Sequence, residues 1–108
     1  MPLDASELSE QMIGAGSAAF GEHWEEAKTF AEIEFRTIAS RLETIAHQVA
    51  RGLDPELARI LFDSQKRTTI QAIAGTAALA ILAVEAAVNS VLEVIRNAVN
   101  TALGFTLL

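Results

Sequence analysis

Apolar residues recur in alternating steps of three and four along two long stretches of the chain. In the second stretch they occupy positions 70, 73, 77, 80/81, 84, 88, 91, 95, 98/99 and 102. This spacing keeps one side of an α-helix apolar for about nine or ten turns at 3.6 residues per turn. The segment 72–84 is apolar on almost every side, because Leu79 and Leu82 point away from the stripe. We therefore expect this helix to pack against partners on more than one face.

The first stretch predicts a helix over residues 18–51. Its apolar positions are Phe20, Trp24, Ala27, Ala31, Phe35, Ile38, Leu42, Ile45 and Val49. Gly52 follows at the position where a left-handed backbone ends a helix. Residues 1–17 are expected to form a frayed or kinked lead-in, since the glycines at 14, 16 and 21 each disfavour a helix by about 1 kcal/mol relative to alanine.

A turn over residues 52–54 separates the two stretches. Asp54 is a favoured helix N-cap, and Pro55 suits the first helical position, where its missing N–H costs nothing. The second helix is expected to run over 55–103, with an apolar tail at 104–108. The predicted fold is an all-α single domain, 1–108, built as a long antiparallel helical hairpin.

A hairpin buries only one stripe of each helix, so the remaining apolar surface predicts self-association, at least to a dimer. Two hairpins would complete a four-helix bundle, and another helical protein is the alternative partner. The expected interface consists of Phe30, Ile33, Leu79, Leu82, Phe105, Leu107 and Leu108. The last three belong to the tail, which ends on apolar residues and is expected to dock onto a neighbour.

Composition narrows the function classes. The chain has 108 residues, 51% of them hydrophobic and 6% aromatic, with a net charge of −6. A negative chain without a basic cluster argues against nucleic acid as a partner. There is no cysteine, which excludes disulfides and Cys-containing zinc sites. The first residues lack the basic flank and apolar run of a secretion signal, so we expect a cytoplasmic protein.

Carboxylates and histidines raise one chemical alternative, a ferritin-like metal-binding bundle. Folding the hairpin about Gly52 would bring Glu85 to the level of His23, and Glu34 lies near the apolar boundary, which makes these three the candidate metal ligands. The Glu-x-x-His signature of di-iron bundles is absent, however. No metal, cofactor or catalytic residue is therefore assigned.

Two polar groups interrupt the second predicted helix. Near its start, Asp63, Gln65, Lys66 and Arg67 form a polar belt. Further on there is a strip at helical spacing, made of Glu85, Asn89, Glu93, Arg96 and Asn100. We interpret the strip as a water-facing side of the helix; the alternative is a polar ladder that fixes the register between subunits.

The apolar segment 72–84 also permits a membrane-active hairpin of the pore- or holin-like kind. At thirteen residues it spans roughly 20 Å, less than the ~30 Å of a bilayer core, and Glu85 limits its extension. The sequence therefore favours a non-enzymatic helical protein for assembly or partner binding. The metal-binding and membrane-active readings remain alternatives.

Overall fold

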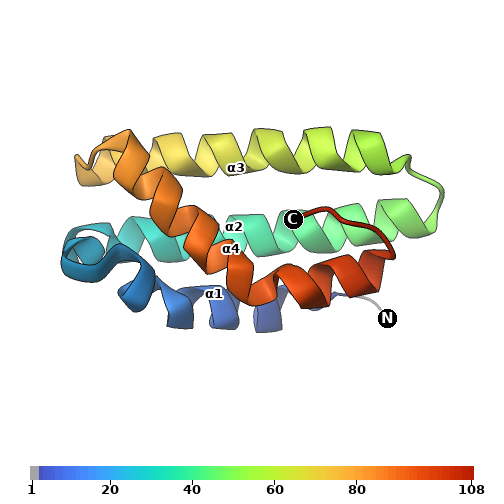
Figure 1. The fold of residues 1–108 in the computed structure, drawn as a ribbon, viewed down its shortest axis with the longest axis horizontal. Coiled ribbons are helices and arrows are strands. Elements are labelled where there is room, and N and C mark those ends of the chain that lie inside the picture. Colours follow the sequence, from blue (N-terminus) through green and yellow to red (C-terminus); the bar gives the residue numbers. More distant parts are fainter. Residues whose placement is uncertain (1–2) are drawn as a thin grey trace.

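The computed structural model describes residues 3–108, and the part described is all-helical, without a strand. Four α-helices follow one another: α1 (Ala5–Phe20), α2 (Trp24–Ala50), α3 (Pro55–Ala77) and α4 (Ile81–Leu103). A short 3-10 helix, η1 (Gly21–His23), joins α1 to α2. The all-α prediction is confirmed, but the helices are arranged differently from a two-helix hairpin (Figure 1).

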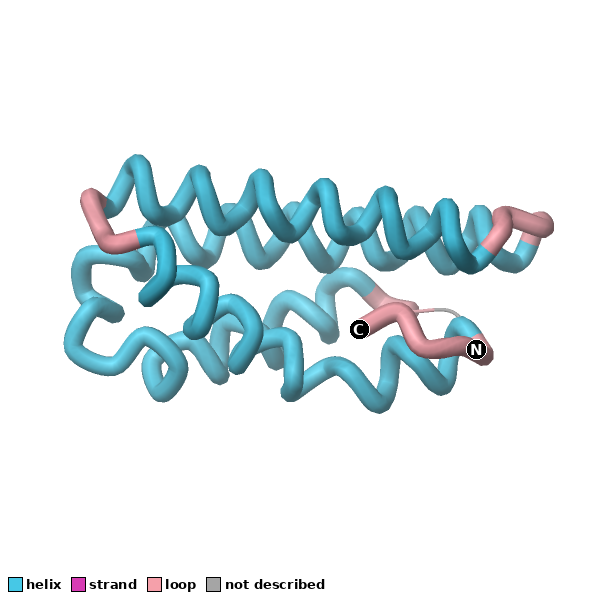
Figure 2. The backbone as a smooth tube through the Cα atoms, turned by 45° about the horizontal axis from the view of Figure 1, so that its top comes forward, coloured by secondary structure: helices cyan, strands magenta, loops and turns pink. Residues whose placement is uncertain are grey.

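The four helices make a bundle within one chain. Helix α2 packs against α1 on one side and α3 on the other, and α4 packs mainly on α1. Figures 1 and 2 show α4 leaving the end of α3 and crossing obliquely towards α1, so that α3 and α4 diverge. The η1 reversal and the α3–α4 turn lie at one end of the bundle, and the α2–α3 turn lies at the other.

The lead-in expected at 1–17 is instead a regular helix from Ala5. Asp4 caps it by accepting a hydrogen bond from the Ser6 N–H at 2.9 Å. A second carboxylate, that of Glu43 in α2, accepts from the Ala5 N–H at 3.0 Å. Both charges lie at the positive end of the α1 dipole, and Glu43 also ties α1 to α2.

The helix predicted over 18–51 therefore begins only at Trp24. Gly21 takes φ +56° and ends α1, and the chain reverses through η1. Gly16 is buried under the indole of Trp24, and a Cβ at this glycine would overlap the ring. Gly21 thus provides the reversal and Gly16 the close packing that let α1 fold onto α2, whereas Gly14 lies within the regular part of α1.

The single helix predicted over 55–103 is also wrong, because the chain bends between α3 and α4. Ala78 adopts the left-handed conformation at φ +56°, and the Leu79 N–H bonds to the Ala74 carbonyl at 3.0 Å. No proline or glycine marks this bend. Its physical reason is burial: after the bend, α4 covers the core that an extended helix would leave open.

The core is filled by the residues of both apolar stripes. Fully buried side chains come from every helix and include Met12, Phe35, Ile38, Leu42, Ile45, Ile73, Val84, Val88, Val91, Ile95 and Val99. Thr69 is the fully buried polar residue at the α2–α3 contact; its hydroxyl donates to a Glu34 oxygen and accepts from the Gln65 amide, both at 3.4 Å. Both apolar stripes are thus largely buried within one chain.

Candidate binding groove between α3 and α4

The divergence of α3 and α4 leaves an open groove with a volume of about 1110 Å³. Nine residues of α3, four of α4 and two of the tail line it. Phe62 and Leu92, one from each helix, are nearly fully buried and give the groove an apolar floor. Ile60 is 64% exposed at its edge. The groove therefore combines an apolar base with an accessible rim.

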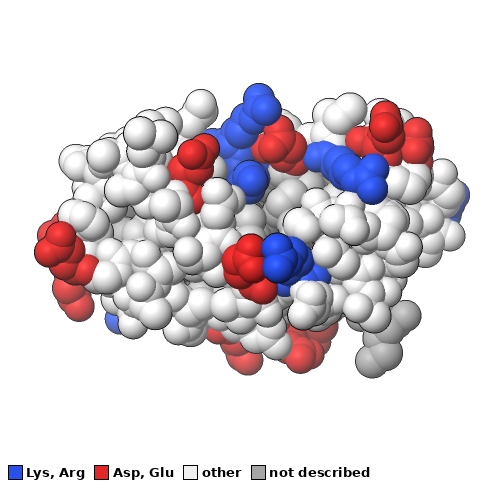
Figure 3. All heavy atoms as spheres, in the orientation of Figure 1, with Lys and Arg blue, Asp and Glu red and all other residues white. Residues whose placement is uncertain are grey.

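Positive charge is concentrated around this groove. Four of the eight Lys and Arg residues line it, namely Arg59, Lys66, Arg67 and Arg96, against two of the fourteen carboxylates, Asp63 and Glu93. The rest of the chain carries the other four cations and twelve carboxylates. Figure 3 shows the basic side chains gathered around the hollow between α3 and α4. The protein as a whole is negatively charged, but the lining of this groove is locally positive.

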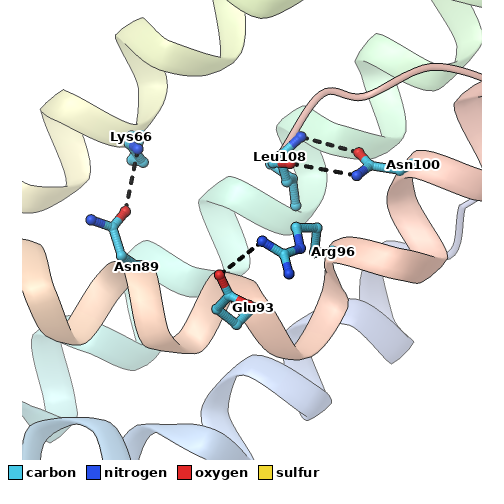
Figure 4. Close-up of polar contacts among 6 residues, drawn as sticks. All are labelled: Lys66, Asn89, Glu93, Arg96, Asn100 and Leu108. Carbon is cyan, nitrogen blue, oxygen red and sulfur yellow. Dashed lines mark hydrogen bonds and ion pairs between the residues drawn. The ribbon is translucent and has the colours of Figure 1, made fainter.

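The polar contacts along the groove are exposed and local. Arg67 pairs with Asp63 at 2.9 Å within α3, and Arg96 pairs with Glu93 at 3.0 Å within α4. Exposed pairs of this kind contribute only about 0.3–0.5 kcal/mol. Across the groove, the Lys66 ammonium donates to the neutral amide oxygen of Asn89 at 3.3 Å (Figure 4). These side chains are held weakly and are available to a ligand.

The tail, residues 104–108, already lies in one end of the groove. The Asn100 side-chain oxygen accepts from the N–H groups of Leu107 and Leu108 at 2.8 and 3.1 Å, and its amide nitrogen donates to the Leu108 carbonyl at 3.4 Å. Arg59 donates to the Thr106 carbonyl at 2.9 Å and lies over the Phe105 ring. Most of these contacts are with main-chain atoms of the tail, so they do not depend on which side chains the tail carries.

Two features of the sequence meet in this site. The α3 belt supplies Asp63, Lys66 and Arg67, and the α4 strip supplies Asn89, Glu93, Arg96 and Asn100, so the strip faces the groove and the tail. Gln65 points instead towards Thr69, and Glu85 is exposed outside the lining. Arg59 was not singled out from the sequence, where it carries no signal beyond its charge.

The three candidate metal ligands are not gathered into one site. His23 lies at the end of η1 with its imidazole 3.8 Å from the Glu22 carboxylate, Glu34 accepts the hydrogen bond from Thr69, and Glu85 is exposed on α4. Within residues 3–108, no group of three or more His, Asp or Glu side chains is placed to hold a metal ion.

The seven residues expected at an interface fall into different environments. Ile33 is 55% exposed on α2 and Leu82 is 75% exposed at the start of α4. Phe30 is half-buried on α2, and Leu79 packs against the core at the α3–α4 turn. The tail residues Phe105, Leu107 and Leu108 are half-buried, and they pack against the core of their own chain. A role for these residues in self-association stays a prediction.

None of the helices in the described part of the chain combines the length and apolar character that crossing a bilayer requires. Comparison of the chain with protein-family models, with curated proteins and with solved structures gave no match.

Proposed function

We propose that the chain is a non-enzymatic, partner-binding helical protein that receives an extended peptide segment in the α3–α4 groove. The observation that carries this proposal is the docked tail, whose main-chain atoms are bound by the side chains of Asn100 and Arg59. The groove offers hydrogen-bond donors and charge around an apolar floor, and both histidines lie outside its lining. These are features of a recognition site.

The test supplies the tail in trans. The labelled peptide Gly-Phe-Thr-Leu-Leu is added to a chain lacking residues 105–108, and binding is followed by fluorescence anisotropy. Asn100→Ala should weaken binding about tenfold or more, because two or three hydrogen bonds of about 0.5–1.5 kcal/mol each are lost. Asn97→Ala, at an exposed position one turn earlier, is the matched control and should leave the affinity unchanged.

The full-length chain gives the second comparison. Its own tail competes for the groove at a high effective concentration, so the peptide should bind it more weakly than it binds the shortened chain. Circular dichroism of each variant confirms that the helices are retained. Equal affinity for the full-length and shortened chains would contradict a peptide-binding groove at this place.

Self-association is a second candidate function, and it is supported by the exposed aliphatic side chains at the α3–α4 turn. Ile81 is 51% and Leu82 is 75% exposed, and no charged residue occurs between Arg67 and Glu85. An uncharged surface of this kind is suited to contact with a second copy. Glu85 follows this surface on α4, and η1, which contains Glu22, lies at the same end of the molecule (Figure 1), so an anionic membrane surface is a poorer fit.

Light scattering behind size exclusion, over a dilution series, tests this second function. We expect a mass above that of one chain at high concentration, shifted to the single-chain mass by Ile81→Glu with Leu82→Glu. Ser40→Glu with Thr44→Glu introduces the same charge at two exposed polar positions of α2, outside this uncharged surface, and should leave the assembly intact. A single-chain mass for the unmodified protein at every concentration would rule self-association out.

A further inference from the structure

We infer that the part of the groove not covered by the tail binds an extended acidic segment of another protein. This ligand class rests on the proposed function, to which it adds the charge of the partner. Lys66, Arg67 and Arg96 line this part of the groove from two helices. Carboxylates of the partner are the groups that these three cations would bind.

The bonding of the three cations favours a carboxylate ligand. Lys66 is half-buried as a residue, and the hydrogen-bond partner of its ammonium group is the uncharged Asn89 amide, so a carboxylate would be a stronger acceptor. The Arg67 and Arg96 guanidinium groups pair within their own helices, with side chains 75% and 46% exposed. A carboxylate of the partner can bind either arginine while that arginine also keeps the carboxylate of its own helix. No unpaired charge is then buried.

The shape of the groove favours a peptide over a small molecule. Its volume of about 1110 Å³ lies above the range of about 300–1,000 Å³ typical of small-ligand pockets. Figure 4 shows Leu108, Arg96 and the Lys66–Asn89 contact following one another along the groove. A chain that continues the path of the tail would therefore pass Arg96 and then Lys66 (Figure 4), and Arg67, Phe62 and Leu92 also line the groove.

The distribution of charge over the whole molecule argues for a short acidic peptide and against a nucleic acid. Twelve carboxylates lie outside the groove lining and the net charge is −6. A nucleic acid carries a closely spaced phosphate on every nucleotide, so it would extend beyond the basic patch into this negative surface. A peptide with alternating apolar and acidic residues matches both the floor and the rim of the groove.

The experiment uses the full-length chain and two fluorescein-labelled peptides, Leu-Glu-Asp-Leu-Glu-Asp-Leu-Glu and its uncharged counterpart Leu-Gln-Asn-Leu-Gln-Asn-Leu-Gln. We expect the acidic peptide to bind about tenfold more tightly at low salt, with the difference reduced as the salt concentration rises. Lys66→Gln with Arg67→Gln and Arg96→Gln should abolish the difference. Lys28→Gln with Arg36→Gln and Arg41→Gln removes the same charge from exposed positions on α2 and should preserve it.

Each other outcome overturns the inference in a distinguishable way. If both peptides bind equally, the groove still binds peptide but does not select acidic ones. If the α2 triple variant loses as much affinity as the groove variant, the attraction is general and not local to the groove. If neither peptide binds while the tail peptide also fails, the proposed function falls as well.

A labelled single-stranded oligonucleotide that binds more tightly than the acidic peptide would overturn the choice of ligand. Lys66→Gln alone keeps the test usable if the triple variant loses helix content.

Discussion

The turn that joins α2 to α3 and the turn that joins α3 to α4 have similar backbone conformations but different side chains. Gly52 at one turn and Ala78 at the other both have positive φ, +105° and +56°. Each is followed by a leucine whose N–H bonds back to the carbonyl five residues earlier, at 2.9 Å for Leu53 and 3.0 Å for Leu79. Each leucine packs against the core. Both turns are therefore Schellman-type helix ends with an apolar residue that points inward.

The residues that start the next helix are also alike in backbone and different in chemistry. Asp54 and Ala80 both have extended backbones, with φ/ψ of −62°/133° and −64°/132°. Asp54 caps α3 by accepting from the Glu56 N–H at 3.2 Å, whereas Ala80 has no side-chain group to cap α4. The α2–α3 turn is thus stabilised locally, and the α3–α4 turn depends on the packing of the helices that it joins.

The larger expected effect comes from giving the first turn the side chains of the second. Gly52→Ala with Asp54→Ala should lower the free energy of unfolding by about 2 kcal/mol, because a left-handed alanine and a lost N-cap each cost about 1 kcal/mol. Urea unfolding followed by circular dichroism measures the change. Gly75→Ala is the matched control: it lies within α3 with open space around its Cβ, and should instead raise stability. A destabilising Gly75→Ala would break the comparison.

The smaller effect has the opposite sign and comes from giving the second turn the side chains of the first. Ala78→Gly with Ala80→Asp should raise the free energy of unfolding by roughly 1–1.5 kcal/mol, since it removes left-handed strain at Ala78 and adds an N-cap to α4. The same urea titration measures it. Ala86→Gly, at an exposed position inside α4, should lower stability by about 1 kcal/mol. If the double variant is no more stable than the unmodified chain, α3 and α4 are not joined by this turn.

The comparison also explains which parts of the fold could be predicted from the sequence. Gly52, Asp54 and Pro55 each favour one position of a turn by local chemistry, so the α2–α3 turn could be placed from the sequence. Ala78 carries no such signal, because alanine is the best helix former and is rarely left-handed. The bend is favoured by the burial of Val84, Val88 and the residues that follow them on α4, worth about 1.5–3 kcal/mol for each large side chain. This is tertiary packing, which a local pattern does not contain.

The candidate site could not be predicted from the sequence, for the same reason. The α3 belt and the α4 strip were both visible as polar positions, but a continuous helix would keep Lys66 and Asn89 more than six turns apart along one axis. The bend at Ala78 instead brings them within a hydrogen bond of each other. The position of the tail also depends on this bend, because Asn100 and Arg59, which bind the tail, belong to the two helices that the bend places side by side.

The contact between Gly16 and Trp24 has a practical consequence for spectroscopy. Trp24 is the only tryptophan and there is no tyrosine, so the intrinsic fluorescence of the protein comes almost entirely from this one indole. Its ring lies over Gly16 beside the η1 reversal and does not line the groove. Separation of α1 from α2 would expose this indole to water, so a shift of the emission to longer wavelength reports that separation. A comparison of that signal with circular dichroism reveals whether this end of the bundle unfolds together with the rest.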